Sequence, residues 1–172
     1  MIYMNVFSEK HKIVLVTTAV ADPFVTGTGA STDIVNMENY KKCTFIVITA
    51  ASAANNGLVT VDTGADNVTC TTATVFKYRT QVAAVPGTVG SDVASTLTTA
   101  AVGGFNMTAS KEGGIYIIEV DAADVAAAGT AFDHVCLNVD DGGTNAAMPY
   151  TSVIAILSEP RYPQDVLATA ID

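Results

Sequence analysis

The chain has few residues of the types that perform acid–base or nucleophilic chemistry. Its 172 residues include two histidines, His11 and His134. A nucleophilic site needs a base, most often histidine, within hydrogen-bond reach of a Ser, Cys or Thr. His11 lies in the charged segment Glu9–Lys12, which indicates a solvated stretch, and His134 opposes the apolar side of its run, which predicts an outward-facing sheet residue. Because no Gly-x-Ser-x-Gly turn is present, we expect no catalytic residues and no enzyme.

Metal-ligand spacing is also missing. Zinc ligands usually come in close pairs such as Cys-x-x-Cys or His-Glu-x-x-His, whereas the three cysteines, Cys43, Cys70 and Cys136, lie far apart in apolar or Thr-rich runs. We expect buried free thiols and not a disulfide framework. Asp140-Asp141-Gly142-Gly143 offers oxygens that suit Ca²⁺, but it lacks the alternating acidic ligands of an EF-hand and predicts an acidic turn. The sequence therefore predicts no metal and no cofactor.

Two weaker patterns predict no site either, and a third stays open. Thr26–Thr32 has the glycines of a phosphate-binding loop but no Lys, no spaced third Gly and no helical pattern after it, so it predicts a plain loop. Asn67-Val68-Thr69 and Asn106-Met107-Thr108 match the glycosylation sequon. Because no secretion signal accompanies them, we interpret them as chance matches. A carboxylate pair for sugar hydrolysis would meet only in the fold, so a hydrolase with such a pair stays open as an alternative, although the chain has no Trp to serve as a sugar platform.

Composition argues against nucleic-acid and membrane partners. The chain carries 8 Lys and Arg against 17 Asp and Glu, a formal net charge of -9, and its longest basic cluster is Lys41-Lys42. Binding to a phosphate backbone needs the opposite balance. No run approaches the roughly 18 apolar residues of a membrane span, and the N-terminal residues show no signal-peptide pattern. We expect no nucleic acid and no membrane as partners, and synthesis in a cytoplasm.

The elements that must position these residues are predicted to be short strands. At 172 residues the chain fits one domain, 1–172, with room for a hydrophobic core. Small and β-branched residues dominate and 15% of residues are charged, which suits packed sheets. Short apolar or alternating runs, each closed by Gly, Asn, Asp or Pro, are typical of an antiparallel sandwich or barrel. About eight strands and a short extended piece are expected, at 13–20, 34–37, 43–49, 58–62, 68–79, 105–109, 114–120, 132–139 and 153–157.

Turn residues predict which runs pair. Asn55-Asn56-Gly57 tolerates positive φ, so a hairpin between 43–49 and 58–62 is expected, and the glycines at 113–114 join 105–109 to 114–120. The strongly apolar run 43–49 predicts a strand buried on both faces. Asp121–Ala128 predicts one short helix, with Asp121 as its N-cap and Gly129 beyond its end. The predicted fold class is all-β, mainly an antiparallel β-sandwich or barrel-like, with one short helix.

The order of several runs resembles a group of small virion structural proteins of tailed bacteriophages. The likeness covers most of the chain as a strand-by-strand pattern, and none of its pieces is a chemical signature. The matching pieces are TDIVNMENY at 32–40 leading into CTFIVIT at 43–49, VTVD at 59–62, FKYR at 76–79, YIIEVD at 116–121 and IAILSEPRY at 154–162.

Within that class the chain looks most like a capsid decoration or cement protein. The resemblance implies a non-enzymatic protein on the capsid surface of the virion, made in the host bacterial cytoplasm. Its implied partners are the major capsid protein and copies of itself, often as a trimer. Tail, head-completion and fibre-attachment virion proteins are alternatives within the class, and a carbohydrate- or Ca²⁺-binding β-sandwich is the alternative outside it. An N-terminal arm (1–12) and a C-terminal arm (160–172) are expected to reach neighbours or to fray.

Overall fold

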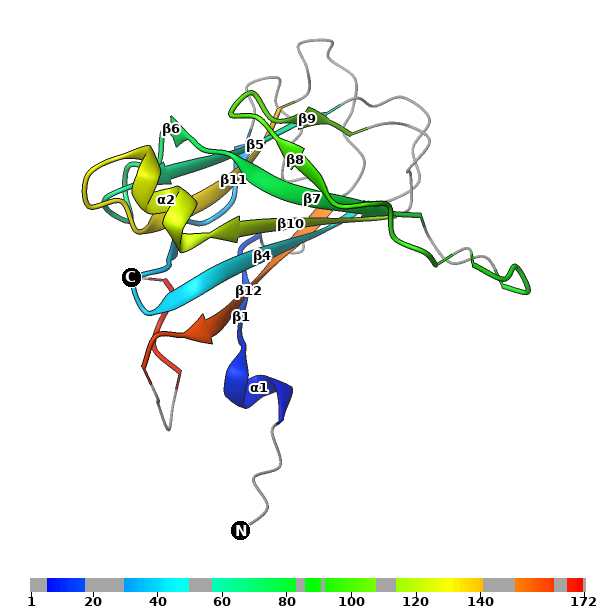
Figure 1. Ribbon diagram of the computed structural model, residues 1–172, viewed down its shortest axis with the longest axis horizontal. Helices are drawn as coiled ribbons and strands as arrows, with labels where there is room; N and C mark the ends of the chain where they lie inside the picture. The colour runs from blue at the N-terminus through cyan, green and yellow to red at the C-terminus, as the bar shows by residue number, and fades with distance from the viewer. Residues whose placement is uncertain are drawn as a thin grey trace.

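The structure is a computed structural model that describes residues 6–17, 30–49, 57–82, 86–90, 92–107, 114–140, 151–162 and 167–171. These residues form two antiparallel sheets that face each other (Figure 1). Of the two helices among them, α1 (Phe7–Lys10) is a single turn and α2 (Ala122–Ala128) is a short helix. The predicted all-β sandwich with one short helix is confirmed. No helix in these ranges is long and apolar enough to cross a membrane.

The first sheet, sheet A, has β4 near its middle. Its spatial order is β1 (Lys12–Leu15), β12 (Thr151–Pro160), β4 (Tyr40–Thr49), β10 (Ile115–Asp121), β7 (Phe76–Gln81) and β8 (Thr98–Ala100). β4 pairs with β10 on one side and with β12 on the other, so Ile46 lies opposite both Ile117 and Ile154. This double pairing satisfies the backbone donors and acceptors of β4 along almost its whole length.

The second sheet, sheet B, is built around β11 (His134–Asp140) and β5 (Leu58–Gly64), which pair along seven residues each. Four two-residue strands extend it: β2 (Ala30–Ser31) and β3 (Val35–Asn36) pair with β11, and β6 (Thr72–Ala73) and β9 (Phe105–Asn106) pair with β5. Ala30 and Ser31 had been placed by sequence in the loop Thr26–Thr32; residues 26–29 of that loop lie outside the described residues.

Most connections carry the chain from one sheet to the other, and this overturns two predicted hairpins. β4 belongs to sheet A and β5 to sheet B, so 43–49 and 58–62 do not pair. Likewise β9 pairs with β5, while β10 pairs with β4 and β7. The run 68–79 is also divided, because β6 lies in sheet B and β7 in sheet A. At each of these connections the strand before and the strand after belong to different sheets. Turn residues alone cannot indicate which sheet the next strand joins.

The core lies between the sheets and follows the two-residue period of the strands. Tyr78 and Phe105 come from facing sheets and stack with ring centroids 3.9 Å apart. Phe76 and Tyr116 contact the same ring of Phe105. The fully buried side chains that fill the rest of this layer are Cys43, Phe45, Val47, Val59, Val61, Ile118, Val135, Leu137, Val139, Val153, Ala155 and Leu157.

The two predicted arms are partly described. Residues 1–5 lie outside the described range, while the α1 turn leads directly into β1, with the rings of Phe7 and His11 stacked at 4.2 Å. At the other end, residues 167–171 pack against the body of the same chain. The Tyr40 hydroxyl donates to the Ala168 carbonyl (2.8 Å), and the Asn36 N–H donates to the Ala170 carbonyl (2.9 Å).

Replacing Phe45 tests the assignment of the two faces of β4. Phe45 is fully buried, so Phe45→Ala removes a large core side chain and leaves a cavity. We expect a loss of about 3–5 kcal/mol in the free energy of unfolding, measured by urea denaturation followed by circular dichroism. The control is Ile46→Ala on the outer face of the same strand. A loss for Ile46→Ala as large as that for Phe45→Ala would contradict the assignment.

Candidate interaction surface

The outer face of sheet A carries a continuous group of large aliphatic side chains. The strand registers place Leu15, Ile154, Ile46 and Ile117 in one row across β1, β12, β4 and β10. The pair Ile13 and Ile156 flanks this row on one side, and the pair Ile48 and Ile115 flanks it on the other. We call the set the isoleucine face: Ile13, Leu15, Ile46, Ile48, Ile115, Ile117, Ile154 and Ile156.

The isoleucine face remains open to solvent in the single chain. Leu15 is 58% exposed, Ile13 53% and Ile48 44%, and the other members are half-buried by their own neighbours in the sheet. The sequence prediction that 43–49 is buried on both faces is therefore wrong, because Thr44, Ile46 and Ile48 point away from the core. Contiguous apolar patches of this kind mark interaction surfaces in soluble proteins.

The face continues to an edge of the sheet. In the described part of sheet A, β1 is the outermost strand on one side and β8 the outermost on the other. An edge strand presents unpaired N–H and C=O groups to which another chain can add. Because the exposed side chains Ile13 and Leu15 belong to this same edge strand, backbone pairing and apolar contact are available together.

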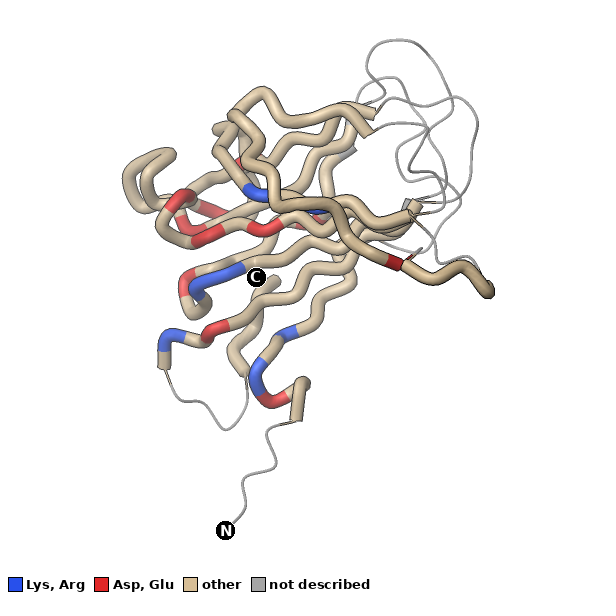
Figure 2. The backbone as a smooth tube through the Cα atoms, turned by 45° about the vertical axis from the view of Figure 1, so that its right-hand side comes forward, with Lys and Arg blue, Asp and Glu red and all other residues tan. Residues whose placement is uncertain are grey.

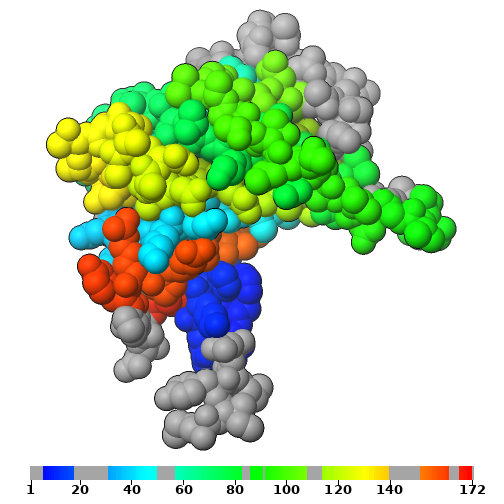
Figure 3. Space-filling model, viewed as in Figure 1, coloured from blue at the N-terminus to red at the C-terminus, as the bar shows by residue number. Residues whose placement is uncertain are grey.

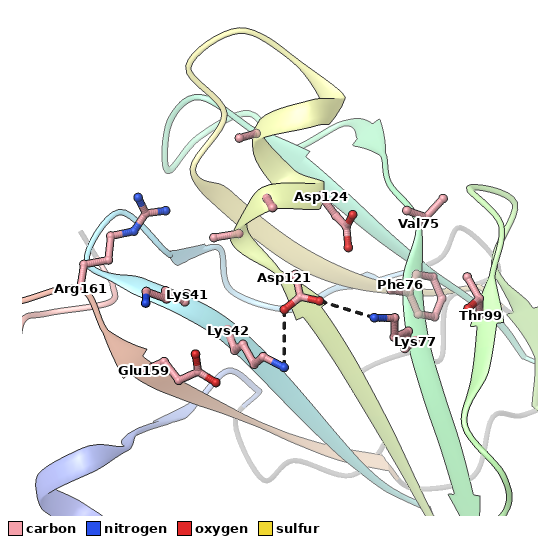
Figure 4. A pocket seen from close by; sticks show the side chains of 13 residues that line it. Lys41, Lys42, Val75, Phe76, Lys77, Thr99, Asp121, Asp124, Glu159 and Arg161 are labelled. Atoms are coloured by element: carbon pink, nitrogen blue, oxygen red, sulfur yellow. Dashed lines mark ion pairs between the residues drawn. The ribbon is translucent and has the colours of Figure 1, made fainter.

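A charged hollow lies at the end of the outer face of sheet A, beside α2 (Figure 4). Asp121 stands between two lysines there, with its carboxylate 3.6 Å from Lys42 Nζ and 3.8 Å from Lys77 Nζ. Asp121 was expected to cap α2, but its side chain makes no capping hydrogen bond and joins this ion-pair group instead. The hollow has a volume of about 730 Å³, within the usual range of binding pockets.

The rim of the hollow concentrates basic residues in an acidic chain. Lys41, Lys42, Lys77 and Arg161 line it, together with the carboxylates Asp121, Asp124 and Glu159, so half of the chain's 8 Lys and Arg residues gather here. Glu159 has φ 54, the left-handed conformation that non-glycine residues rarely adopt. Figure 2 shows basic residues (blue) of β4 and of the segment just after β12 at this end of the molecule.

His134 is buried, although the sequence predicted that it faces solvent. It lies on the expected side of β11, but its side chain is 6% exposed. The segment 65–71 covers this part of sheet B, and Cys70 within it contacts the His134 carbonyl (Sγ to O 3.9 Å). Nδ1 of His134 lies 2.5 Å from the Asp133 carboxylate. The ring is therefore held inside the protein and is not presented to a substrate.

The covering segment 65–71 has a clear local cause. Asp66 Oδ1 accepts hydrogen bonds from the N–H groups of Val68 (2.9 Å) and Thr69 (2.6 Å), and these bonds hold the pKa of Asp66 below its ordinary value. A Cβ at Gly64 would lie 1.9 Å from the Thr69 carbonyl oxygen. Glycine at 64 and aspartate at 66 thus allow the segment to fold back over β5 and β11.

The cysteines are free thiols, but the prediction that all three are buried is wrong for Cys70. Cys43 and Cys136 are buried, whereas Cys70 is half-buried. Burial raises the pKa of Cys43 well above its ordinary range. Hydrogen bonding to Cys136, together with burial, raises the pKa of Cys70. The thiolate is the reactive form, so neither shift favours a nucleophile.

The remaining sequence candidates do not come together as a site. In the described parts of the chain, no group of three His, Cys, Asp or Glu side chains is arranged to hold a metal ion. Asp140 ends β11, and Asp141, Gly142 and Gly143 lie outside the described residues. The Thr32 hydroxyl accepts from the Leu137 N–H (3.0 Å) and therefore ties the chain to β11.

Comparison with known proteins identifies no family for the chain. No protein-family model and no curated protein matches the chain. Among solved structures, a chain in "Structure of infectious bursal disease virus Gt strain" is similar at 11% identity with a TM-score of 0.22. The likeness covers 95% of this chain and 44% of that one, so the chain spans less than half the length of that protein. At this level the similarity carries no argument about function.

Thiol reactivity tests the burial of the cysteines. In the native protein at pH 8 we expect an aromatic disulfide reagent to leave Cys43 and Cys136 unmodified, because both thiols are buried and that of Cys43 has a raised pKa. All three thiols should react after unfolding in guanidinium. Cys70→Ser serves as the control and should remove any slow native reaction. Modification of native Cys43 at the rate of the unfolded chain would contradict the structure.

Proposed function

We propose that the chain is a structural protein of a bacteriophage virion, of the capsid decoration or cement type. In this role it binds the outside of the head shell and neighbouring copies of itself, and it carries out no reaction. The observation that supports this proposal is the isoleucine face, an aliphatic surface that spans four strands and on which Ile13, Leu15 and Ile48 are exposed.

The physical case for an assembly surface comes from the cost of leaving this face in water. Each large aliphatic side chain gains about 1.5–3 kcal/mol when fully buried, so partial burial of several against a partner stabilises a contact. The sheet also holds these side chains in fixed rows, so little side-chain conformational freedom is lost on binding. Repetition over a shell lattice multiplies a weak contact through multivalency.

The distribution of titratable groups agrees with a binding role. His134 is enclosed under segment 65–71, and the raised pKa values of Cys43 and Cys70 keep both thiols protonated. The carboxylate of Asp121 is engaged with Lys42 and Lys77. These groups stabilise the fold or form ion pairs, and none of them is presented as an activated nucleophile.

The proposal is tested by separating the parts of the source particle. Purified chain is mixed with stripped head shells and, separately, with isolated tails, and co-sedimentation is measured. We expect saturable binding to head shells and none to tails. Binding to tails alone would move the assignment to a tail or fibre component. Binding to neither, with a clear calorimetric signal for glycans or Ca²⁺, would replace it with a ligand-binding sandwich.

Two substitutions on the isoleucine face test its part in binding. Ile46→Thr with Ile117→Thr keeps β-branched side chains on paired strands and places hydroxyls at the centre of the face. We expect at least about a tenfold loss of head-shell affinity, the equivalent of about 1.4 kcal/mol. Val68→Thr is the matched control, because Val68 is 82% exposed in the segment that covers sheet B.

Circular dichroism must show that both proteins remain folded. Unchanged affinity of the folded double variant would show that the isoleucine face is not the contact.

A further inference from the structure

A second feature outside the isoleucine face points to a contact between copies. Residues 86–90 and 92–97, between β7 and β8, extend away from the body of the protein, as the green projection in Figures 1 and 3 shows. We call these residues the β7–β8 arm. Val89 at its tip is fully exposed and Val93 is 69% exposed.

The arm is fixed at its base and unsupported at its tip. At the base, the Ser95 N–H donates to the Thr80 carbonyl (2.7 Å), and the Ser95 hydroxyl accepts from the Thr80 N–H (2.9 Å). Arg79 Nη1 also donates to the Ser95 carbonyl (2.8 Å). Near the tip, the Val93 N–H donates to the Gly90 carbonyl (3.3 Å), which closes a turn at a glycine with φ 78. The turn therefore holds two valine side chains outward, where they are available to a partner.

The arm and the charged hollow have complementary chemistry. The apolar lining of the hollow includes the exposed side chains of Val75 and Ala126. Among the described residues Lys41 and Arg161 make no ion pair, and neither do the lining carboxylates Asp124 and Glu159. The arm offers two exposed valines and Asp92 between them in sequence. Apolar side chains with one carboxylate match a hollow that exposes apolar side chains and carries four basic against three acidic residues.

The two features lie at opposite ends of the same sheet. The hollow contains Phe76 and Lys77 at the start of β7, and the arm leaves after Gln81 at its end. A six-residue strand spans about 20 Å at 3.3 Å per residue, and the arm points away from the hollow (Figure 1). An arm fixed in this direction cannot reach the hollow of its own chain, so a second copy must supply the partner.

We propose that the β7–β8 arm of one copy inserts into the charged hollow of the next. Val89 and Val93 pack against Val75 and the exposed alanines of α2, Ala123 and Ala126, and the Asp92 carboxylate pairs with Lys41 or Arg161. Because arm and hollow are different surfaces, the contact is head-to-tail and leads to a ring or an open chain of subunits. The inference rests on the proposed function in one respect, since it assumes that the chain works as an assembly.

Reversal of charge on each side of the contact provides the test. Sedimentation velocity over a range of concentrations gives the self-association constant of the intact chain. Asp92→Lys, or Lys41→Asp with Arg161→Asp, should weaken association about five- to tenfold, because like charges then face each other. The combined triple variant should regain most of the loss. The matched controls are Glu38→Lys and Lys10→Asp, exposed residues outside both features, and these should leave association unchanged.

A zero-length carbodiimide reagent gives a second readout. It should join Asp92 of one copy to Lys41 of another, detected as a cross-linked peptide in the dimer band by mass spectrometry. The proposal is overturned if the chain is monomeric at every concentration, if the charge reversals have no more effect than their controls, or if the triple variant shows no recovery.

The outcomes separate this inference from the proposed function. Normal self-association of arm and hollow variants, together with loss of head-shell binding by the isoleucine-face variant, would remove the arm contact and keep the decoration role. Loss of self-association by the arm variants, with no binding of the intact chain to head shells, would keep the arm contact and remove the decoration role.

Discussion

The two-sided pairing of β4 is the constraint on which the rest of this structure depends. With β10 on one side and β12 on the other, the backbone of β4 is satisfied and its side chains must alternate between two environments. Phe45 then belongs to the core and Ile46 to the outer face. The same registers align the isoleucines of β10 and β12 with those of β4. The pairing of these three strands therefore fixes the core on one face and the aliphatic surface on the other.

The sequence predicted the elements of the fold better than their partners. Alternating or apolar runs bounded by turn residues were enough to locate β4, β5, β10, β11, β12 and α2, because strand and helix patterns are local. Pairing was not local. Asn55-Asn56-Gly57 indicated a hairpin, yet β4 before it lies in sheet A and β5 after it lies in sheet B, and both strands contribute to the core between the sheets. A sequence read one window at a time contains no signal for that choice.

The candidate surface was hidden from sequence for the same reason. An apolar run such as 43–49 has the same sequence pattern whether its second face packs against a helix, contacts a partner or faces solvent. The hollow unites Lys41, Lys77 and Arg161 from three strands or their ends, and no spacing along the chain could have predicted this group. His134 was placed on the correct side of its strand, but its burial depends on segment 65–71 and therefore on Gly64 and Asp66.

Sheet A thus carries both features that we associate with assembly, an aliphatic face across its centre and complementary arm and hollow at its ends. Cryo-electron microscopy of the native particle tests the central claim, that this sheet is an assembly surface on a capsid, most directly. The account predicts density for the chain on the outside of the head, with the isoleucine face covered by a neighbouring protein. Density confined to the tail, or a head-bound chain whose isoleucine face is open to solvent, would contradict it.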